Sequence, residues 1–158
     1  MKTWKFAAPV VVALTLTTAA WATHSSDPAE LIRERQQMMK DNGAAMKVIG
    51  GYIQAGAGSL EDVAAAAKVL IDSAAVMPDY FPEGSGMDDV ADPRNGAKPV
   101  IWSGWAGFEA AAAKLGSEAT AMRNAAQAGD SDAVTAQMET LGAQGCGGCH
   151  QTFRQKLE

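Results

Sequence analysis

The chain has 158 residues, of which 47% are hydrophobic and 20% are charged, and its formal net charge is −5 at pH 7. A chain of this length is expected to form one domain. Its acidic balance argues against a nucleic-acid-binding protein, because the phosphates of DNA and RNA would repel it.

The first 22 residues have the features of a secretory signal peptide. Lys2 and Lys5 precede an apolar run over residues 6–20, and Ala20-Trp21-Ala22 forms a small-x-small cleavage pattern. The run is short for a retained membrane anchor, so we expect residues 1–22 to be removed and residues 23–158 to form the mature domain. Loss of both lysines would leave 11 basic against 18 acidic residues, a formal charge of −7. No later stretch is apolar enough to span a bilayer, so the sequence predicts a periplasmic protein that is not bound to the membrane.

Two amphipathic helices are expected next. The first should begin at Asp27-Pro28, an N-cap followed by proline in the first helical position, and end near Gln54. The second should begin at Ser59, with Asp62 three residues later as in a capping box, and stop at Met77-Pro78. The inner seam of the first helix advances in steps of three and four residues and comprises Ile32, Arg35, Met39, Asn42, Met46, Ile49 and Ile53.

A long irregular stretch, residues 78–99, separates these helices from two more. The third helix carries a heptad pattern from Ile101 to Ala126 and should end at Gly129. The fourth should be capped at Asp130 or Ser131 and continue to the C-terminus. Four amphipathic helices with two short links and one long link predict an all-α fold, an antiparallel up-down-up-down four-helix bundle.

The stretch from Cys146 to His150 reads C-x-x-C-H, the spacing typical of covalent c-type haem attachment. On a helix, residues three and four apart share a face, so both thiols and the imidazole can meet one flat porphyrin. A zinc site would need two more ligands, yet the chain has no other cysteine and only His24 besides His150. A thioredoxin-like dithiol would need a βαβ setting, which the sequence lacks. The motif therefore predicts one covalently bound haem c with His150 as an iron ligand.

Three motifs follow one another along the chain: Arg35-Gln36 followed by Met39 and Gly43, Lys98-Pro99 followed by Ile101-Trp102, and Cys146 to His150 followed by Phe153-Arg154. In this order they resemble the class II c-type cytochromes, the cytochrome c′ family. The resemblance implies a four-helix bundle with a haem near one end. It is closest to the low-spin members, electron carriers in which a methionine of the first helix is the sixth iron ligand, and Met39 falls on that position. Other members are high-spin and bind nitric oxide or carbon monoxide at an open distal face, and some of these also carry methionine there.

Depth in the bundle gives an independent argument about the methionines. His150 lies about 12 Å from the C-terminal end of its helix and Met39 about 16 Å from the start of the first helix, so the two residues are at similar depth. Three methionines are excluded because they lie too deep in the bundle or on the helix of His150: Met46, Met122 and Met138. Met77 and Met87 in or near the long loop remain alternatives. We expect His150 and Met39 to be the axial ligands, a known c-type pair.

Three further residues are candidates for contact with the cofactor. Trp102 should lie near the haem level, although it could equally be a core aromatic residue. Arg154 is four residues after His150, so it should share that helix face and could hold a haem propionate or extend into solvent. Arg35 lies on the inner seam, where a buried guanidinium needs an anion, and a propionate is the nearest candidate.

These residues predict an electron-transfer protein rather than an enzyme. General acid–base chemistry beside a haem usually needs a second positioned histidine or carboxylate, and His150 is the only histidine in the expected bundle. The alternative function is a high-spin protein that binds nitric oxide or carbon monoxide. The expected partner is a periplasmic redox protein of unknown identity. Family members are often dimers through their first two helices, and Ala44, Ala45 and Val48 are candidates for such a homodimer face.

Overall fold

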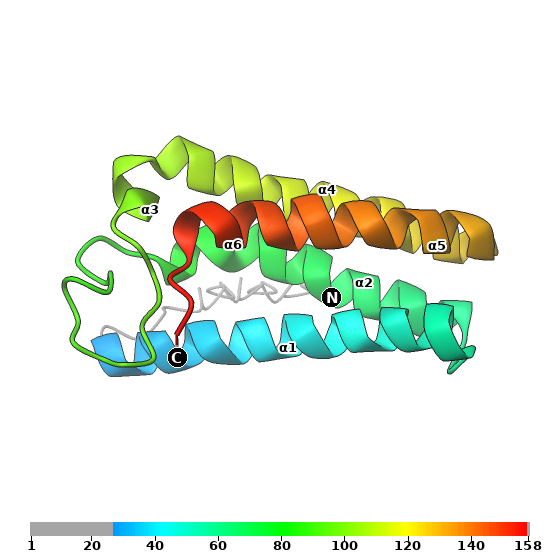
Figure 1. Ribbon diagram of the computed structural model, residues 1–158, viewed down its shortest axis with the longest axis horizontal. Coiled ribbons are helices and arrows are strands. Elements are labelled where there is room, and N and C mark those ends of the chain that lie inside the picture. Colours follow the sequence, from blue (N-terminus) through cyan, green and yellow to red (C-terminus); the bar gives the residue numbers. More distant parts are fainter. Residues whose placement is uncertain (1–26, 158) are drawn as a thin grey trace, which may run out of the picture.

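The computed structural model describes residues 27–157, which form a bundle of four long helical rods (Figure 1). The first two rods are α1 (Pro28–Ala55) and α2 (Leu60–Val76), and the third is α4 (Trp105–Gln127), preceded by the short helix α3 (Val100–Ser103). The fourth rod consists of α5 (Ser131–Thr140), a π-helical segment (Leu141–Gly147) and α6 (Gly148–Phe153). Consecutive rods run in opposite directions, so the predicted up-down-up-down bundle is confirmed. The signal peptide expected at residues 1–22 lies outside the described residues.

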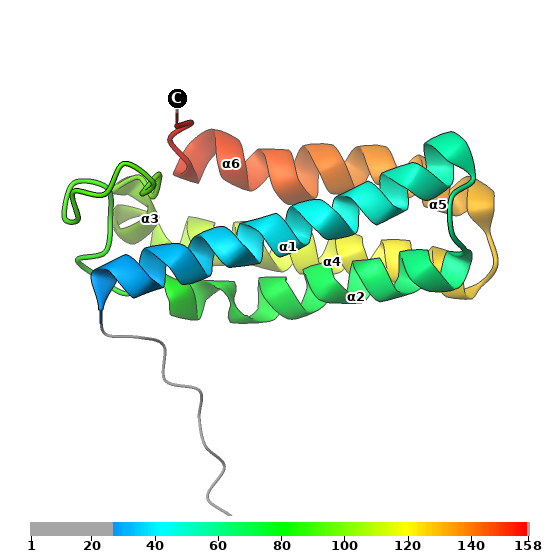
Figure 2. The same ribbon diagram turned by 90° about the horizontal axis from the view of Figure 1, so that it is seen from below.

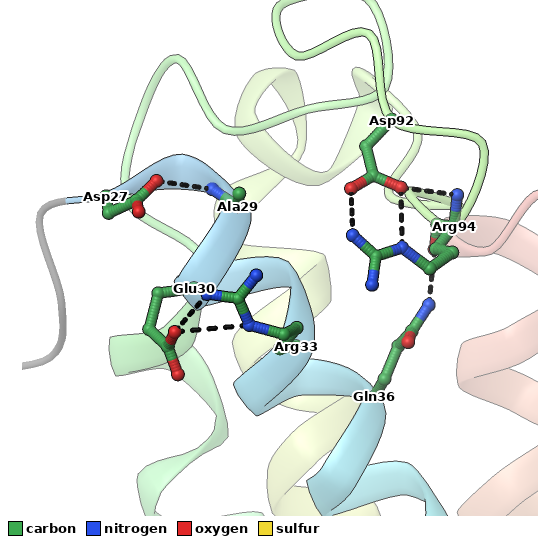
Figure 3. Close-up of polar contacts among 7 residues, drawn as sticks. All are labelled: Asp27, Ala29, Glu30, Arg33, Gln36, Asp92 and Arg94. Carbon is green, nitrogen blue, oxygen red and sulfur yellow. Dashed lines mark hydrogen bonds and ion pairs between the residues drawn. The ribbon is translucent and has the colours of Figure 1, made fainter.

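The helix starts follow the predicted capping chemistry. The Asp27 side chain accepts a hydrogen bond from the backbone N–H of Ala29 at 2.9 Å, which Figure 3 shows at the start of α1. Ser59 and Asp62 form the reciprocal capping box of α2, with the backbone N–H of Ser59 donating to Asp62 Oδ2 at 2.8 Å. Asp130 is the N-cap of α5. These bonds satisfy backbone donors that each first turn leaves unpaired, so the sequence located the starts of three rods correctly.

Two of the expected helices differ from their predicted extents. The third is interrupted at Gly104, which separates α3 from α4. The fourth was expected to reach the C-terminus, but it ends at Phe153, and Arg154 is extended with φ −111° and ψ 129°. The last residues instead pair with the long loop, since the backbone N–H of Gln155 donates to the carbonyl of Gly96 at 2.8 Å and that of Lys98 donates to the carbonyl of Phe153 at 3.1 Å. In Figure 1 the C-terminal stretch accordingly turns away from the axis of α6 at the loop end of the bundle.

Small residues allow α2 and α4 to pack closely. Ala67, Ala74, Ala112 and Ala119 are all buried between helices. A Cβ atom on Gly116 would lie 3.4 Å from the Cβ of Ala74, so these two helices approach to van der Waals distance. The part of the bundle away from the loop is filled by fully buried side chains, which include Ile49, Val63, Met122 and Val134.

The predicted seam of α1 faces the bundle, but its burial is uneven. Ile32, Arg35, Asn42 and Ile49 are buried. Met39 and Met46 are only partly buried although they lie between these residues on the same face. Partly exposed methionines on an inward face indicate open space inside the bundle.

Candidate functional site

Two cavities lie at the loop end of the bundle and share four lining residues, Met39, Met77, Cys149 and His150. The inner cavity has a volume of about 290 Å³ and reaches between α1, α2 and α4. Its walls are largely apolar and include Leu70, Ala111, Ala112 and Leu115. The outer cavity has a volume of about 700 Å³ and extends to the long loop and the C-terminal stretch. The four shared residues border both spaces, so the two cavities adjoin each other and we treat them as one candidate site.

The C-x-x-C-H motif supplies one wall of this site. Cys146 belongs to the π-helical segment and lines the inner cavity, whereas Cys149 and His150 belong to α6 and line both cavities. Burial raises the pKa of both thiols, and the neighbouring Cys146 raises that of Cys149 further. Burial also lowers the pKa of His150, with the positive charge of Arg154 adding to this effect. The imidazole is therefore neutral at neutral pH, which is the form that ligates a metal.

The π-helical segment is rich in glycine, and one of its glycines packs tightly. A Cβ atom on Gly145 would lie 3.3 Å from Leu141 Cδ1 and 3.4 Å from Leu115 Cδ1. The absence of a side chain at position 145 therefore helps the segment to lie close against α4. Widened helical turns of this kind occur frequently at functional sites.

Met39 supplies the opposite wall from α1, as the depth argument predicted. Of the two alternatives, Met77 also lines both cavities and is 3% exposed, whereas Met87 lines neither of them. Met46 lines only the inner cavity. Met138 lines neither cavity and lies beside Gly50, at the other end of the bundle. Met39 and Met77 are therefore the methionines that line both cavities together with His150.

The residues present fit a covalently attached haem. Two thiols and an imidazole come from one helical stretch, a thioether faces them from α1, and the walls between them are apolar. The sequence profile of the family described as Cytochrome C′ matches residues 30–154, which span all four rods. This chain belongs to the cytochrome c′ family. Proteins of this family carry covalently bound haem c with iron, so haem c is the cofactor of this protein.

Individual relatives agree with the family assignment over most of the chain. Cytochrome c-556 of Agrobacterium tumefaciens (strain II Chrys) is 36% identical over 126 residues, which cover 79% of this chain and 97% of that protein. Cytochrome c′ of Rhodospirillum rubrum is 28% identical over 145 residues, which cover 92% and 95% of the two chains. The crystal structure of cytochrome c′ from Thermochromatium tepidum matches with a TM-score of 0.72 at 28% identity and covers 82% of this chain and 98% of that one.

Arg35 in this cytochrome c′ family member is buried, but its charge is met by the long loop. Its Nε donates to the carbonyl of Tyr80 at 2.6 Å, its Nη1 donates to the carbonyl of Ser85 at 2.8 Å, and its Nη2 donates to the Ser85 hydroxyl. Burial lowers the pKa of Arg35 to about 10, so the guanidinium stays charged at neutral pH. Loop oxygens therefore accept from all three nitrogens of the guanidinium group. Arg35 also lines the outer cavity, so its contact with an anion such as a haem propionate stays a prediction.

Trp102 contacts the long loop and does not line either cavity. Its indole N–H donates to the carbonyls of Phe81 and Pro82 at 2.9 and 3.1 Å, and its ring leaves no room for a side chain at Gly86, where a Cβ atom would lie 2.7 Å away. It lines neither of the two cavities and borders a separate hollow with Pro78 and Glu83. The structure therefore does not bring Trp102 together with the motif residues.

Arg154 lines the outer cavity together with His150. It is the C-cap of α6, so its backbone is extended, but its N–H still donates to the carbonyl of His150 at 3.3 Å. Its side chain is exposed, and its contact with a haem propionate stays a prediction.

Two polar residues of the site were not among the candidates that the sequence indicated. Asn95 is buried in the loop, and its side-chain amide donates to the carbonyl of Gly86 at 2.8 Å. Asn42 lines the inner cavity, where its Nδ2 donates to Ser73 Oγ at 2.9 Å while its Oδ1 is buried without a partner. The seam position predicted that Asn42 would face inward, but not which residue of α2 it would contact.

Proposed function

We propose that this protein is a periplasmic electron carrier in which Cys146 and Cys149 form the two thioether links to haem c. His150 and Met39 are the axial ligands of its iron. The observation that carries the proposal is that Met39 and His150, from α1 and α6, border the same two cavities. Membership in a family of haem proteins supports the proposal, because it accounts for the presence of the haem.

The chain's own residues are suited to holding such a group in a dry pocket. Leu70, Ala112 and Leu115 give the inner cavity an apolar wall, which disfavours water. Phe81, Phe108 and Phe153 line the outer cavity and pack edge to face, with centroids 4.8 and 5.4 Å apart for the two pairs that share Phe108. The haem, when bound, supplies an iron that gains and loses one electron. A rigid apolar shell and two protein ligands limit the rearrangement that accompanies this change.

The optical spectrum of the purified protein tests the axial ligands. We expect a low-spin spectrum that carbon monoxide leaves unchanged. Met39→Ala should keep the haem attached, turn the iron high-spin, allow carbon monoxide to bind and lower the reduction potential, because a neutral thioether favours the ferrous state. Met46→Ala is the matched control, since Met46 lies on the same seam and lines only the inner cavity. A wild type that binds carbon monoxide readily, or a Met77→Ala variant that alone becomes high-spin, would overturn the assignment of Met39.

The second candidate function is a high-spin protein that binds nitric oxide or carbon monoxide. The space around Met39 favours it, because the inner cavity continues along α1 past Asn42 and Gly43, and a Cβ atom on Gly43 would meet no atom within 4 Å. The inner cavity therefore leaves open space beside Met39. The carbon monoxide titration of the wild type separates the two functions.

Export and self-association complete the proposal. We expect the mature protein to begin at residue 23 in the periplasm, and N-terminal sequencing of periplasmic protein tests this cleavage site. Among the described residues, no helix is both long and apolar enough to cross a membrane.

A homodimer through α1 and α2 would use exposed residues of these helices. Ala44 is exposed and Val48 is 43% exposed, but Ala45 is buried inside its own bundle and cannot contact a second copy. If this face forms the dimer, Val48→Glu should shift the protein to monomers in sedimentation velocity.

A further inference from the structure

The outer cavity is bordered by positive charge in a chain that is acidic as a whole. Five cationic residues and no aspartate or glutamate line it. The complete chain has 18 acidic residues against 13 basic ones. Four of these cations are exposed and define what we call the basic rim, which consists of Lys40, Arg94, Arg154 and Lys156. The fifth, Arg35, is buried behind them.

The fold assembles the basic rim from three separate segments. Lys40 lies on α1, Arg94 lies in the long loop, and the other two residues lie in the C-terminal stretch. The side-chain amide of Gln36 donates to the carbonyl of Arg94 at 3.1 Å, which ties the loop to α1 (Figure 3). The backbone bond from Gln155 to Gly96 ties the C-terminal stretch to the same loop. The positive charges are therefore held together by defined contacts rather than by chance proximity.

Internal pairing does not account for all of this charge. Arg94 donates from Nε to Asp92 Oδ1 at 2.9 Å, so one carboxylate offsets one member of the rim. Among residues 27–157, no ion pair involves Lys40, Arg154 or Lys156. Two haem propionates would offset two further charges at most. The outer cavity therefore keeps a net positive border even with its cofactor in place.

We propose that the basic rim is the docking surface for the acidic face of a redox protein. The inference rests on the proposed electron-transfer function. The outer cavity, which Cys149 and His150 line, opens within the rim, so a partner docked there lies close to the group that these residues hold. The acidic remainder of the surface repels such a partner, which directs it to the rim and raises the rate of productive encounters.

Two small oxidants of opposite charge test the local field. The reduced protein is mixed with hexacyanoferrate(III), an anion, or with tris(phenanthroline)cobalt(III), a cation, across a range of ionic strength. The net charge of the chain predicts that salt accelerates oxidation by the anion, whereas the basic rim predicts that salt slows it. We expect a decrease of about tenfold for hexacyanoferrate(III) between low and high salt. A rate that rises with salt would overturn the proposal.

Charge reversal identifies the responsible residues. The double variant Lys40→Glu/Lys156→Glu should slow oxidation by hexacyanoferrate(III) about tenfold at low salt and should accelerate oxidation by the cobalt complex. Lys47→Glu is the matched control, because Lys47 is an exposed lysine of α1 that does not line the outer cavity. The single variant Lys40→Glu carries the same change of charge as this control. If both single variants changed the oxidation rates equally, only the total charge would matter and the proposal would be wrong.

A binding measurement tests docking without electron transfer. Poly-L-glutamate serves as the probe for an acidic protein surface and is titrated into the ¹⁵N-labelled holoprotein. Amide shifts should concentrate at residues 36–40, 92–97 and 153–157, and the double variant should lose them. Shifts spread over the whole surface, or no binding at low salt, would overturn the proposal. Because this measurement does not depend on the axial ligands, its outcome is separate from that of the carbon monoxide titration.

Discussion

The guanidinium carbon of Arg35 lies 4.2 Å from the centroid of the Phe81 ring, so a buried charge on α1 is held against an aromatic face of the long loop. The same side chain donates to two loop carbonyls. Arg35 thereby holds the long loop beside the outer cavity. Its planar guanidinium group can stack on the Phe81 ring and donate hydrogen bonds to the loop carbonyls at the same time.

Arg35→Leu should lower the free energy of unfolding by about 2–4 kcal/mol, because it leaves buried carbonyls unpaired and removes the stacking contact. Arg35→Lys should recover only part of this loss, since an ammonium cannot reproduce the fork. Urea unfolding of the holoprotein measures both values. Arg33→Ala is the control, because the Arg33–Glu30 pair is exposed and its loss should cost less than about 1 kcal/mol. A cost for Arg35→Leu no larger than that of the control would contradict the role of Arg35.

The Asn42–Ser73 hydrogen bond allows a double-mutant test of buried polarity. Ser73→Ala should destabilise the protein by about 1–3 kcal/mol, because it leaves the buried amide of Asn42 without its acceptor. The double variant Asn42→Leu/Ser73→Ala should be much less destabilised, since both polar partners are then replaced by apolar groups. Urea unfolding of the two single variants and the double variant gives the coupling energy. Simple additivity would show that the bond contributes nothing.

Haem attachment through the two thiols predicts a specific mass. The periplasmic protein should have the mass of residues 23–158 plus one haem, and acid–acetone extraction should leave the haem on the chain. Cys146→Ser or Cys149→Ser should leave a single thioether link, and the double variant should lose covalent haem altogether. Recovery of a free dithiol from wild-type protein would be incompatible with this assignment.

Two glycines of the fourth rod should respond in opposite ways to alanine. Gly145→Ala should destabilise the protein by about 1–3 kcal/mol, because its Cβ would press on Leu141 and Leu115 in a packed region. Gly148→Ala should be neutral or stabilising by up to about 1 kcal/mol, because that position is exposed, helical and free of contacts within 4 Å. Urea unfolding checks both, and a destabilised Gly148→Ala variant would show that the motif needs glycine there for another reason.

The sequence by itself determined the features that depend on local chemistry and on spacing along one helix. Asp27 and Ser59 cap their helices with their own side chains, so both starts were predictable without a partner. The inward seam of α1 and the C-x-x-C-H motif also depend only on the spacing of residues within one stretch of chain. Even the shared depth of Met39 and His150 followed from rise per residue once the helices were taken as antiparallel.

Only the tertiary structure decided how the long loop and the C-terminal stretch contribute. Residues 78–99 have no periodicity, so nothing in their pattern indicated that Ser85 would accept from Arg35 or that the carbonyls of Phe81 and Pro82 would accept from Trp102. The helix was expected to run through Arg154, but pairing with the loop at Gly96 ends it at Phe153. The basic rim exists for the same reason. Its members are up to 116 positions apart in sequence, from Lys40 to Lys156, and only contacts between distant segments bring their charges to one cavity.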